Sequence, residues 1–361
     1  MRSQFLMSNG QEYPLCSMAW SGQPIVDACA VQSHYGHLLV LTTDGTLHGV
    51  DFDTGVCVEL CLVELPELIR NSGQQYFVTF AYRLHASWNG KYAAIVIDGG
   101  REGVVVDVSS GAITMRLHGG SYHEGTVPFS ACFLRDEERS VFVHRTAWNR
   151  LDTADPATVE SLTERYIAPY VAGEDRPAHY LDYFHGRLHP SPDGSRLFDD
   201  GWGWQPVSVP RAWAVGEWLG ANPWESEDGA SLMSLTMRDD WNTPACWISE
   251  QHIALWGLAD WDAEEFAEKE QGMGVRILNA TESEQPADRQ WPMEINANEV
   301  LNLFSEGTHL YVAADTGTTV WEIASGRQIA GLPGFVARLH DPARGSLVAI
   351  ATDSIVELTL P

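Results

Sequence analysis

Short runs of alternating apolar and polar residues recur along the whole chain, and a tight turn precedes each run. Alternation with a period of two is typical of a β-strand with one buried face. The turns are rich in Gly, Pro, Asn and Asp, which tolerate the backbone conformations that turns need. Seven such units, roughly 40 to 57 residues apart, predict a repeat of small antiparallel sheets. The seven runs read HLLVLTT, KYAAIVI, SVFVHRT, SRLFDD, HIALWGL, THLYVAA and SLVAIAT.

A second motif follows several of these runs at the same offset. It reads VDFDTG from Val50 to Gly55, VDVSSG from Val106 to Gly111 and WEIASG from Trp321 to Gly326. In each copy an alternating strand ends in a turn, and the closing glycine can adopt a positive φ without steric cost. The motif therefore predicts another strand in each unit.

The last unit is incomplete at its carboxy-terminal end. It contains ARLHD, SLVAIAT and SIVELTL, and then the sequence stops. A sheet that lacks its fourth strand exposes an unpaired edge. We expect the amino-terminal segment around Gln4 to Ser8 to supply that strand and so to close a ring of sheets.

The repeat resembles known propeller families. WEIASG is similar to the end of a repeat in WD-repeat-like propellers, and SPDG at Ser191 to Gly194 resembles a hairpin turn of YVTN-like and quinoprotein-like propellers. The stretch from Asp182 to Val215 is similar to one in uncharacterised bacterial propeller proteins. Gly-His and Trp-Asp dipeptides at strict spacing are absent, so the resemblance is to a divergent member. It implies an all-β, closed seven-bladed propeller of four-stranded antiparallel blades, formed by residues 1–361 as one domain.

The net charge of −27 restricts the partners of this protein. Nucleic acids and anionic membrane surfaces repel so acidic a chain, whereas a basic protein is attracted to it. The chain has no apolar run long enough for a membrane helix or a secretion signal, and its six cysteines are scattered. We therefore expect a cytoplasmic protein with small buried thiols, no cofactor and no affinity for membranes or nucleic acid.

Acidic residues and tryptophans concentrate in residues 199–271. Twelve acidic and two basic residues lie in 222–270, and nine of the 14 tryptophans lie in 202–261. The segment Ala259 to Gln271 is rich in helix formers and predicts a short acidic helix or excursion. Most of the tryptophans are expected to pack between sheets. Trp202 and Trp204, in the Gly-rich turn GWGW, are expected at the surface as part of a binding site.

The innermost strands of a propeller line its central channel, and their polar residues are candidates for ligand binding. We select Arg83, His85, Asp182, His185 and Arg338 as binding residues. Converging His, Asp and Arg side chains can bind a small ligand in the channel or transfer protons. The alternative is that they satisfy one another and the channel water. If the protein is an enzyme, Asp182 with His185 is the predicted catalytic pair.

No metal site is predicted. Asp260, Asp262 and Glu264 offer oxygen ligands, but the glycine and the final glutamate of a calcium loop are missing. The pair His34 and His37, and the pair Asp199 and Asp200, are expected at the surface or in turns.

No common nucleotide-binding, zinc-protease or serine-hydrolase motif occurs. The sequence favours a non-catalytic interaction module that recognises a partner protein, expected to be basic. The alternative is a lactonase-like or other hydrolase at the channel mouth, acting on a small uncharged or cationic substrate.

Overall fold

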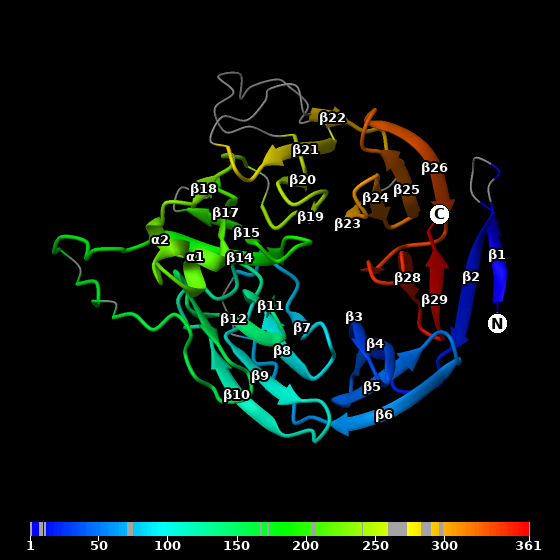
Figure 1. The fold of residues 1–361 in the computed structure, drawn as a ribbon, viewed down its shortest axis with the longest axis horizontal. Helices are drawn as coiled ribbons and strands as arrows, with labels where there is room; N and C mark the ends of the chain where they lie inside the picture. Colours follow the sequence, from blue (N-terminus) through cyan, green and yellow to red (C-terminus); the bar gives the residue numbers. More distant parts are fainter. Residues whose placement is uncertain are drawn as a thin grey trace.

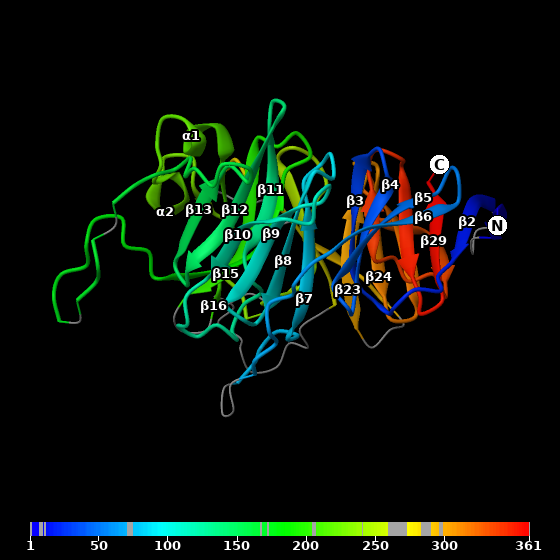
Figure 2. The same ribbon diagram turned by 90° about the horizontal axis from the view of Figure 1, so that it is seen from below.

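Seven antiparallel sheets surround a central axis in the computed structural model (Figure 1). Strands make up almost all of the regular structure, so the predicted all-β, seven-bladed propeller is confirmed. Seen from the side, the ring is a disc crossed by the strands (Figure 2). The residues that the structure describes are 2–6, 10, 12–70, 75–166, 168–171, 173–203, 207–239, 241–258, 273–282, 290–295 and 299–360.

The first three blades follow the chain from the innermost strand outward. Blade 1 contains β3 (Ile25–Ser33), β4 (Gly36–Thr42), β5 (Thr46–Asp51) and β6 (Val56–Leu62). Blade 2 contains β7 (Ala81–Ala86), β8 (Tyr92–Asp98), β9 (Glu102–Asp107) and β10 (Ile113–His118). Blade 3 contains β11 (Ala131–Asp136), β12 (Arg139–Ala147) and β13 (Arg150–Ala154), and a bridge between Ala154 and Ser161 extends its outer edge.

The next three blades repeat the pattern with larger insertions. Blade 4 contains β14 (Tyr183–Pro190), β15 (Arg196–Gly203), β17 (Arg211–Ala214) and β18 (Met233–Ser234), with β16 (Val207–Ser208) also paired to β15. Two short helices, α1 (Val215–Leu219) and α2 (Glu225–Asp228), connect β17 to β18. Blade 5 contains β19 (Ala245–Trp247), β20 (His252–Trp256), β21 (Gly274–Asn279) and β22 (Gln290–Pro292). Blade 6 contains β23 (Val300–Ser305), β24 (His309–Ala314), β25 (Gly317–Glu322) and β26 (Arg327–Pro333).

Blade 7 combines both ends of the chain. Its inner strands are β27 (Leu339–Asp341), β28 (Ser346–Ile350) and β29 (Ser354–Thr359), and β2 (Glu12–Ala19) pairs antiparallel with β29. The strand β1 (Arg2–Leu6) pairs with the outer edge of β2. The expected position of the amino-terminal donor, around Gln4 to Ser8, is therefore wrong: residues 12–19 lie beside β29. The longer segment buries Tyr13 and Met18, which the short apolar run Phe5-Leu6-Met7 did not reveal.

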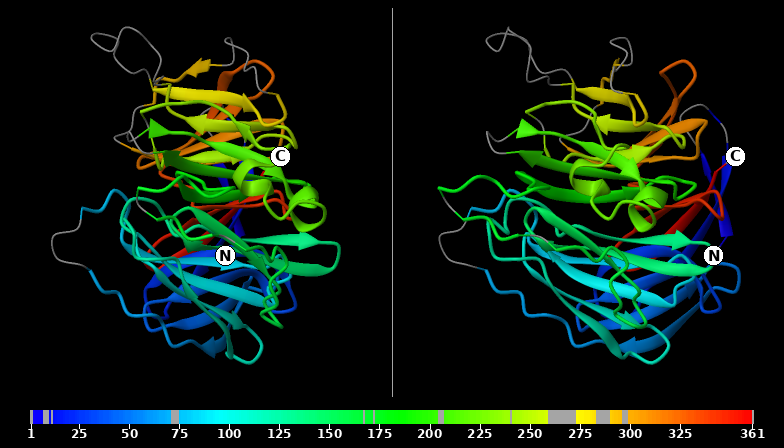
Figure 3. Two further views of the ribbon diagram at one scale, coloured as in Figure 1. Left: turned by 90° about the vertical axis from the view of Figure 1, so that its left-hand side faces the viewer. Right: turned by 60° about the vertical axis from the view of Figure 1, so that its left-hand side comes forward.

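Neighbouring blades are held together by separate buried apolar clusters. Between blades 1 and 2, Leu39 and Leu41 of β4 pack in one cluster with Ala93 and Ile95 of β8, and all four are 0% exposed. Equivalent clusters lie at the other six interfaces, including the one between blades 7 and 1. The tilted views show the sheets stacked face to face around the axis (Figure 3). Burial of these flat faces is the main source of stability.

A polar network adds to the seam between blades 7 and 1. Arg344 donates hydrogen bonds to Glu357 over 2.6 Å and to Asp53 over 3.1 Å, and its guanidinium lies 3.1 Å from Nε2 of His37. Arg344 and Glu357 belong to blade 7, whereas His37 and Asp53 belong to blade 1. The network therefore joins the first and last repeats of the ring.

The innermost strands all begin on one face of the ring, here called the start face, and finish on the other, the end face. The connection between β13 and β14 is long and extends away from the ring (Figures 1 and 2). The predicted excursion at Ala259 to Gln271 lies outside the described residues. Among those described, no helix has the length and apolar character to cross a membrane.

The position of β2 predicts unequal effects of two truncations. Deleting residues 1–11 removes only the outer strand β1, so we expect a melting temperature close to that of the full chain. Deleting residues 1–20 exposes the edge of β29 and removes Tyr13 and Met18, which costs roughly 3 kcal/mol or more. Urea unfolding followed by circular dichroism measures both losses. Equal losses from the two deletions would contradict the role given to β2.

Candidate functional site

Two cavities open along the central channel. The cavity on the start face has a volume of about 630 Å³, and the cavity on the end face has a volume of about 1160 Å³. They have four lining residues in common, Arg187, Asn302, Pro244 and Leu339, from blades 4 to 7. These residues form the waist of the channel, where the two cavities meet.

The start-face cavity contains a compact group of charges from blades 1 and 2. Arg83 of β7 donates from Nε to Asp98 over 3.1 Å, and its Nη2 lies 3.0 Å from the same carboxylate. Asp27 of β3 lies 3.9 Å from Arg83 and accepts a 2.8 Å hydrogen bond from the Leu84 amide. Burial raises the pKa of Asp27. Burial alone would lower the pKa of Arg83, but the charges of Asp98 and Asp27 outweigh this effect and raise the pKa of Arg83. Arg83 is therefore a paired structural charge as well as a channel residue.

Arg187 of β14 reaches the waist without such a pair. Among the described residues, none accepts a hydrogen bond from its guanidinium and no carboxylate lies at ion-pair distance from it. Burial lowers the pKa of Arg187 and the nearby charge of Arg83 lowers it further, while the carboxylates of Asp98, Asp200 and Asp27 offset part of this shift. The sequence-based selection of channel residues did not include Arg187. The sequence did contain a signal for Arg187: it stands two residues from both His185 and His189, which is the spacing of side chains on one face of a strand.

Two histidines stand close to these arginines. Burial lowers the pKa of His85 to about 4 and that of His189 to about 3, and the positive charges of Arg83 and Arg187 contribute to both shifts. Nε2 of His85 is buried and has no hydrogen-bond partner among the described residues. Both imidazoles are therefore neutral near pH 7 and leave the cationic charge to the arginines.

A bulge in β14 sets the direction of Arg187. Regular pairing with β15 is interrupted between Phe184 and Arg187, and the carboxylate of Asp199 accepts a 2.6 Å hydrogen bond from Nδ1 of His185 and a 2.8 Å bond from the Gly186 amide. Gly186 has to be glycine, because a Cβ atom there would lie 1.9 Å from the carbonyl oxygen of Asp200. His185 and Asp199 are 1% and 0% exposed, and His185 does not line either cavity.

The predicted pair of Asp182 with His185 does not form. Asp182 accepts a 2.7 Å hydrogen bond from the exposed Arg176, and the partner of His185 is Asp199. The expectation that Asp199 and Asp200 lie at the surface is wrong, since both are buried in β15. Asp200 forms a 3.1 Å ion pair with buried Arg238, which precedes blade 5. Two consecutive carboxylates are thus buried inside one strand, where His185 and the Gly186 amide satisfy Asp199 and Arg238 satisfies Asp200.

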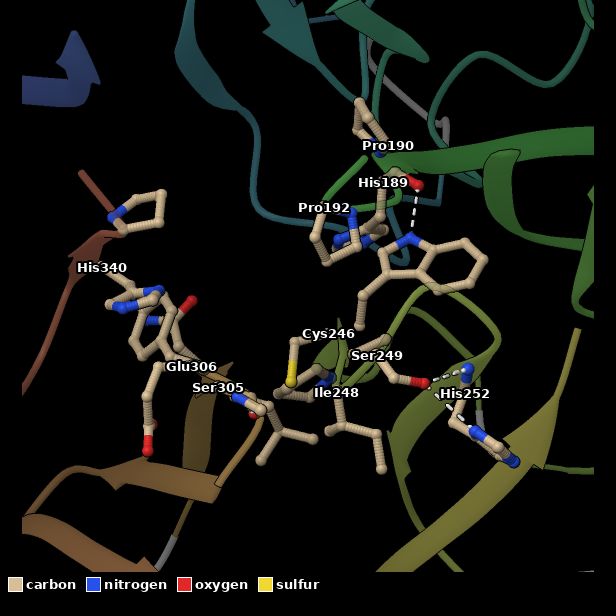
Figure 4. Close-up of a pocket in the computed structure, with 18 of the residues that line it drawn as sticks. His189, Pro190, Pro192, Cys246, Ile248, Ser249, His252, Ser305, Glu306 and His340 are labelled. Carbon is tan, nitrogen blue, oxygen red and sulfur yellow. Dashed lines mark hydrogen bonds between the residues drawn. The ribbon is translucent and has the colours of Figure 1, made fainter. Parts of the chain in front are cut away.

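The end-face cavity combines apolar walls with imidazoles (Figure 4). His189, Cys246, Ile248 and His340 lie around it, from blades 4, 5 and 7. The indole Nε1 of Trp247 donates to the carbonyl of His189 over 2.8 Å, which joins blades 4 and 5 at the cavity wall. Burial lowers the pKa of His340 and raises that of the Cys246 thiol. The imidazoles of His189 and His340 and the Cys246 thiol are therefore uncharged near pH 7. The charged residues that line this cavity are Arg187, Glu250 and Glu306, and Glu306 pairs with His309 at 2.7 Å.

Aromatic side chains form a continuous cluster on the start face beside the cavity. Trp202 stacks on Phe184 with ring centroids 4.5 Å apart and meets Trp241 edge-on at 5.1 Å. Phe77 lies 5.0 Å from Trp241, and Tyr122 lies 6.2 Å from Phe184. We call these five residues, Phe77, Tyr122, Phe184, Trp202 and Trp241, the aromatic cluster.

The exposed members of the aromatic cluster are not the ones that the sequence suggested. Trp202 is 6% exposed and is covered by its neighbours, so the expected surface position is wrong for this residue. Trp204 lies outside the described residues. Phe77 and Tyr122 are 44% and 47% exposed and form the accessible rim.

Backbone contacts fix the loops that carry the aromatic cluster. The Phe77 amide donates to the Gly125 carbonyl over 2.9 Å, and the Asn242 side chain donates to the Thr126 carbonyl over 3.1 Å. Loops that precede blades 2, 3 and 5 are thereby tied together. The start face consequently presents its aromatic side chains in a fixed arrangement.

The remaining predicted residues lie apart from one another. Arg338 is exposed and lines the start-face cavity. His34 is exposed in the turn before β4, as expected. His37, Asp51 and Asp53 are close enough together to hold a cation, but Arg344 already donates to Asp53 and lies against His37.

Comparisons with known proteins support the fold. No family model and no curated protein matches the sequence. A solved structure described as "Crystal Structure of Mitotic Checkpoint Complex" contains a similar chain, with a TM-score of 0.51 and 11% identity over 94% of this chain and 93% of that one. This likeness concerns the fold, which is a seven-bladed β-propeller. Because 808 solved chains match, the likeness specifies no function, and the resemblance to bacterial propellers stays a prediction.

The shifted histidines predict a pH dependence of stability. His85 and His189 have folded-state pKa values of about 4 and about 3, below the ordinary 6.5, so the unfolded chain binds protons first as the pH falls. Their contribution to stability is complete above pH 6.5 and is lost as the pH falls toward 4. The melting temperature of the wild type should therefore fall between pH 6.5 and pH 4. In a variant with both His85 and His189 replaced by Asn, the melting temperature should fall less over the same pH range. An unchanged decrease would show that other groups cause it.

The buried pair in blade 4 predicts a structural rather than catalytic role. Asp199→Ala leaves His185 and the Gly186 amide without their acceptor, and we expect a loss of about 3–5 kcal/mol in unfolding free energy. Asp182→Ala, whose partner Arg176 is exposed, should cost less than about 0.5 kcal/mol. Urea titrations of the two variants measure these values. A small loss for Asp199→Ala would contradict the assignment.

Proposed function

We propose that this propeller is a non-catalytic protein-interaction module, with the aromatic cluster on the start face as its binding surface. The observation that carries the proposal is the exposure of Phe77 and Tyr122 above a buried layer of stacked rings. Aromatic side chains are enriched among the residues that dominate binding energy at protein interfaces. Their loops are already fixed, so little conformational entropy is lost when a partner binds.

The partner is proposed to present basic residues. The chain carries a net charge of −27, and exposed carboxylates are placed in the connections of the start face. Glu299 lines the mouth of the cavity, and Glu64, Glu67 and Asp353 lie in neighbouring connections. Opposite charge on the partner raises the association rate and disfavours acidic competitors. The pair that the sequence suggested for the hydrolase alternative, Asp182 with His185, does not form, because His185 is buried against Asp199.

Variants of the exposed rim test this proposal. Phe77→Ala with Tyr122→Ala removes the accessible rings while the layer beneath them stays buried, and each hot-spot residue contributes about 2 kcal/mol or more. Affinity capture from the native organism, followed by titration of the recovered partner, should show a loss of at least about 30-fold. Tyr166→Ala is the matched control, since Tyr166 is 81% exposed in the connection between β13 and β14.

The same titration tests the charge of the partner. Binding of a basic partner weakens as the salt concentration rises, because screening reduces the attraction. Affinity that ignores salt, or a captured partner that is itself acidic, would refute the electrostatic part. Retained affinity in the double variant would refute the location of the surface.

A further inference from the structure

The waist of the channel holds the guanidinium of Arg187. Arg187 lines both cavities, and no described residue accepts a hydrogen bond from it or pairs with it. Withdrawing a charge from water is costly unless a counter-charge and hydrogen bonds compensate. Among the described residues, carboxylates pair with Arg83, Arg238 and Arg344 but none pairs with Arg187.

The charged residues around Arg187 determine which ligand charge the waist can accept. Asp98 is committed to Arg83 through two contacts of 3.0 and 3.1 Å, and Asp27 accepts hydrogen bonds from the amides of Ala28 and Leu84. His85 and His189 are neutral near pH 7. Arg187 therefore has no contacting counter-charge among the described residues, and the carboxylates of Asp98, Asp200 and Asp27 act on it only from a longer distance. A ligand with one negative charge can pair with the guanidinium, whereas a phosphate dianion is repelled more strongly by Asp27, Asp98 and Asp200.

The end-face cavity accommodates an apolar group next to this charge. Leu188, Ile248 and Leu303 are buried in its wall, and Phe304 and Leu339 also line it. The cavity volume of about 1160 Å³ is large enough for a small organic molecule. Figure 4 shows Ile248, Cys246 and His189 around the space. The ligand that fits both features has a charged head and an apolar body.

We propose that the channel binds a small organic monocarboxylate, with the carboxylate on Arg187 and its apolar body in the end-face cavity. A planar guanidinium binds a planar carboxylate through two parallel hydrogen bonds. The neutral imidazole of His189 stands on the same strand face, two residues further along β14. The residues of this site are different from those of the aromatic cluster, which lies on the start face.

Sodium hexanoate is the probe for this site, compared with hexan-1-ol and with inorganic phosphate at constant ionic strength. We expect hexanoate to give a saturable rise in melting temperature and a calorimetric binding isotherm with the wild-type protein. The neutral alcohol lacks the charge and phosphate lacks the apolar body, so neither should do so. In Arg187→Met the hexanoate affinity should fall at least tenfold, and Arg187→Lys should retain part of it. A wild-type protein that gives no saturable response to hexanoate overturns the proposal.

The stability of the ligand-free variants provides the second measurement. Arg187→Met removes an unpaired charge, so its melting temperature should equal or exceed that of the wild type. Arg83→Met is the matched control: it leaves Asp98 and Asp27 without their cation and should lower the melting temperature. If Arg187→Met destabilises the protein as much as Arg83→Met, Arg187 is a structural residue and the proposal is wrong. Undiminished hexanoate binding by Arg187→Met would also refute it.

Discussion

Face-to-face burial between adjacent sheets is the interaction on which this structure depends. A small twisted sheet with two apolar faces is unstable in water, and the ring gives each blade a neighbour on both sides. Each of the seven interfaces between neighbouring blades contains a buried apolar cluster, including the interface between blades 7 and 1. Closure of the ring is therefore a condition for the stability of every blade. The segment Glu12–Ala19 and the Arg344 network meet it by joining the first and last repeats.

Blade 4 is where the regular pattern is modified most. Its two inner strands contain a bulge, two buried carboxylates and two glycines in close backbone contact. Such polar groups cost stability unless each is satisfied, and here Asp199 and Asp200 have His185 and Arg238 as partners. The result is a strand that turns Phe184 toward the start face and Arg187 into the channel. The polar interior of this blade thus determines the two features that we assign to binding.

The sequence predicted the ring because alternation and turns are local signals that repeat. It did not predict which polar residues are buried, because that depends on partners far away in the chain. Asp200 looked like a surface residue until Arg238, 38 residues later, was placed against it. Trp202 looked exposed because of the glycines beside it, but the pairing of β14 with β15 stacks it on Phe184. For His185 and Arg187 the difficulty was the bulge, which separates residues that simple alternation places on one face.

The two proposed sites differ in what they require of the fold. The aromatic cluster lies on loops, and its rigidity comes from cross-loop hydrogen bonds between neighbouring blades. The waist site lies on an innermost strand, where the position of the guanidinium is set by sheet pairing and by Asp199. Both converge on β14, because Phe184 and Arg187 are three residues apart on either side of the bulge. A change at Asp199 should consequently disturb both sites together, whereas changes at Phe77 or Arg187 affect only one. This dependence identifies the bulge as the structural link between the two binding surfaces.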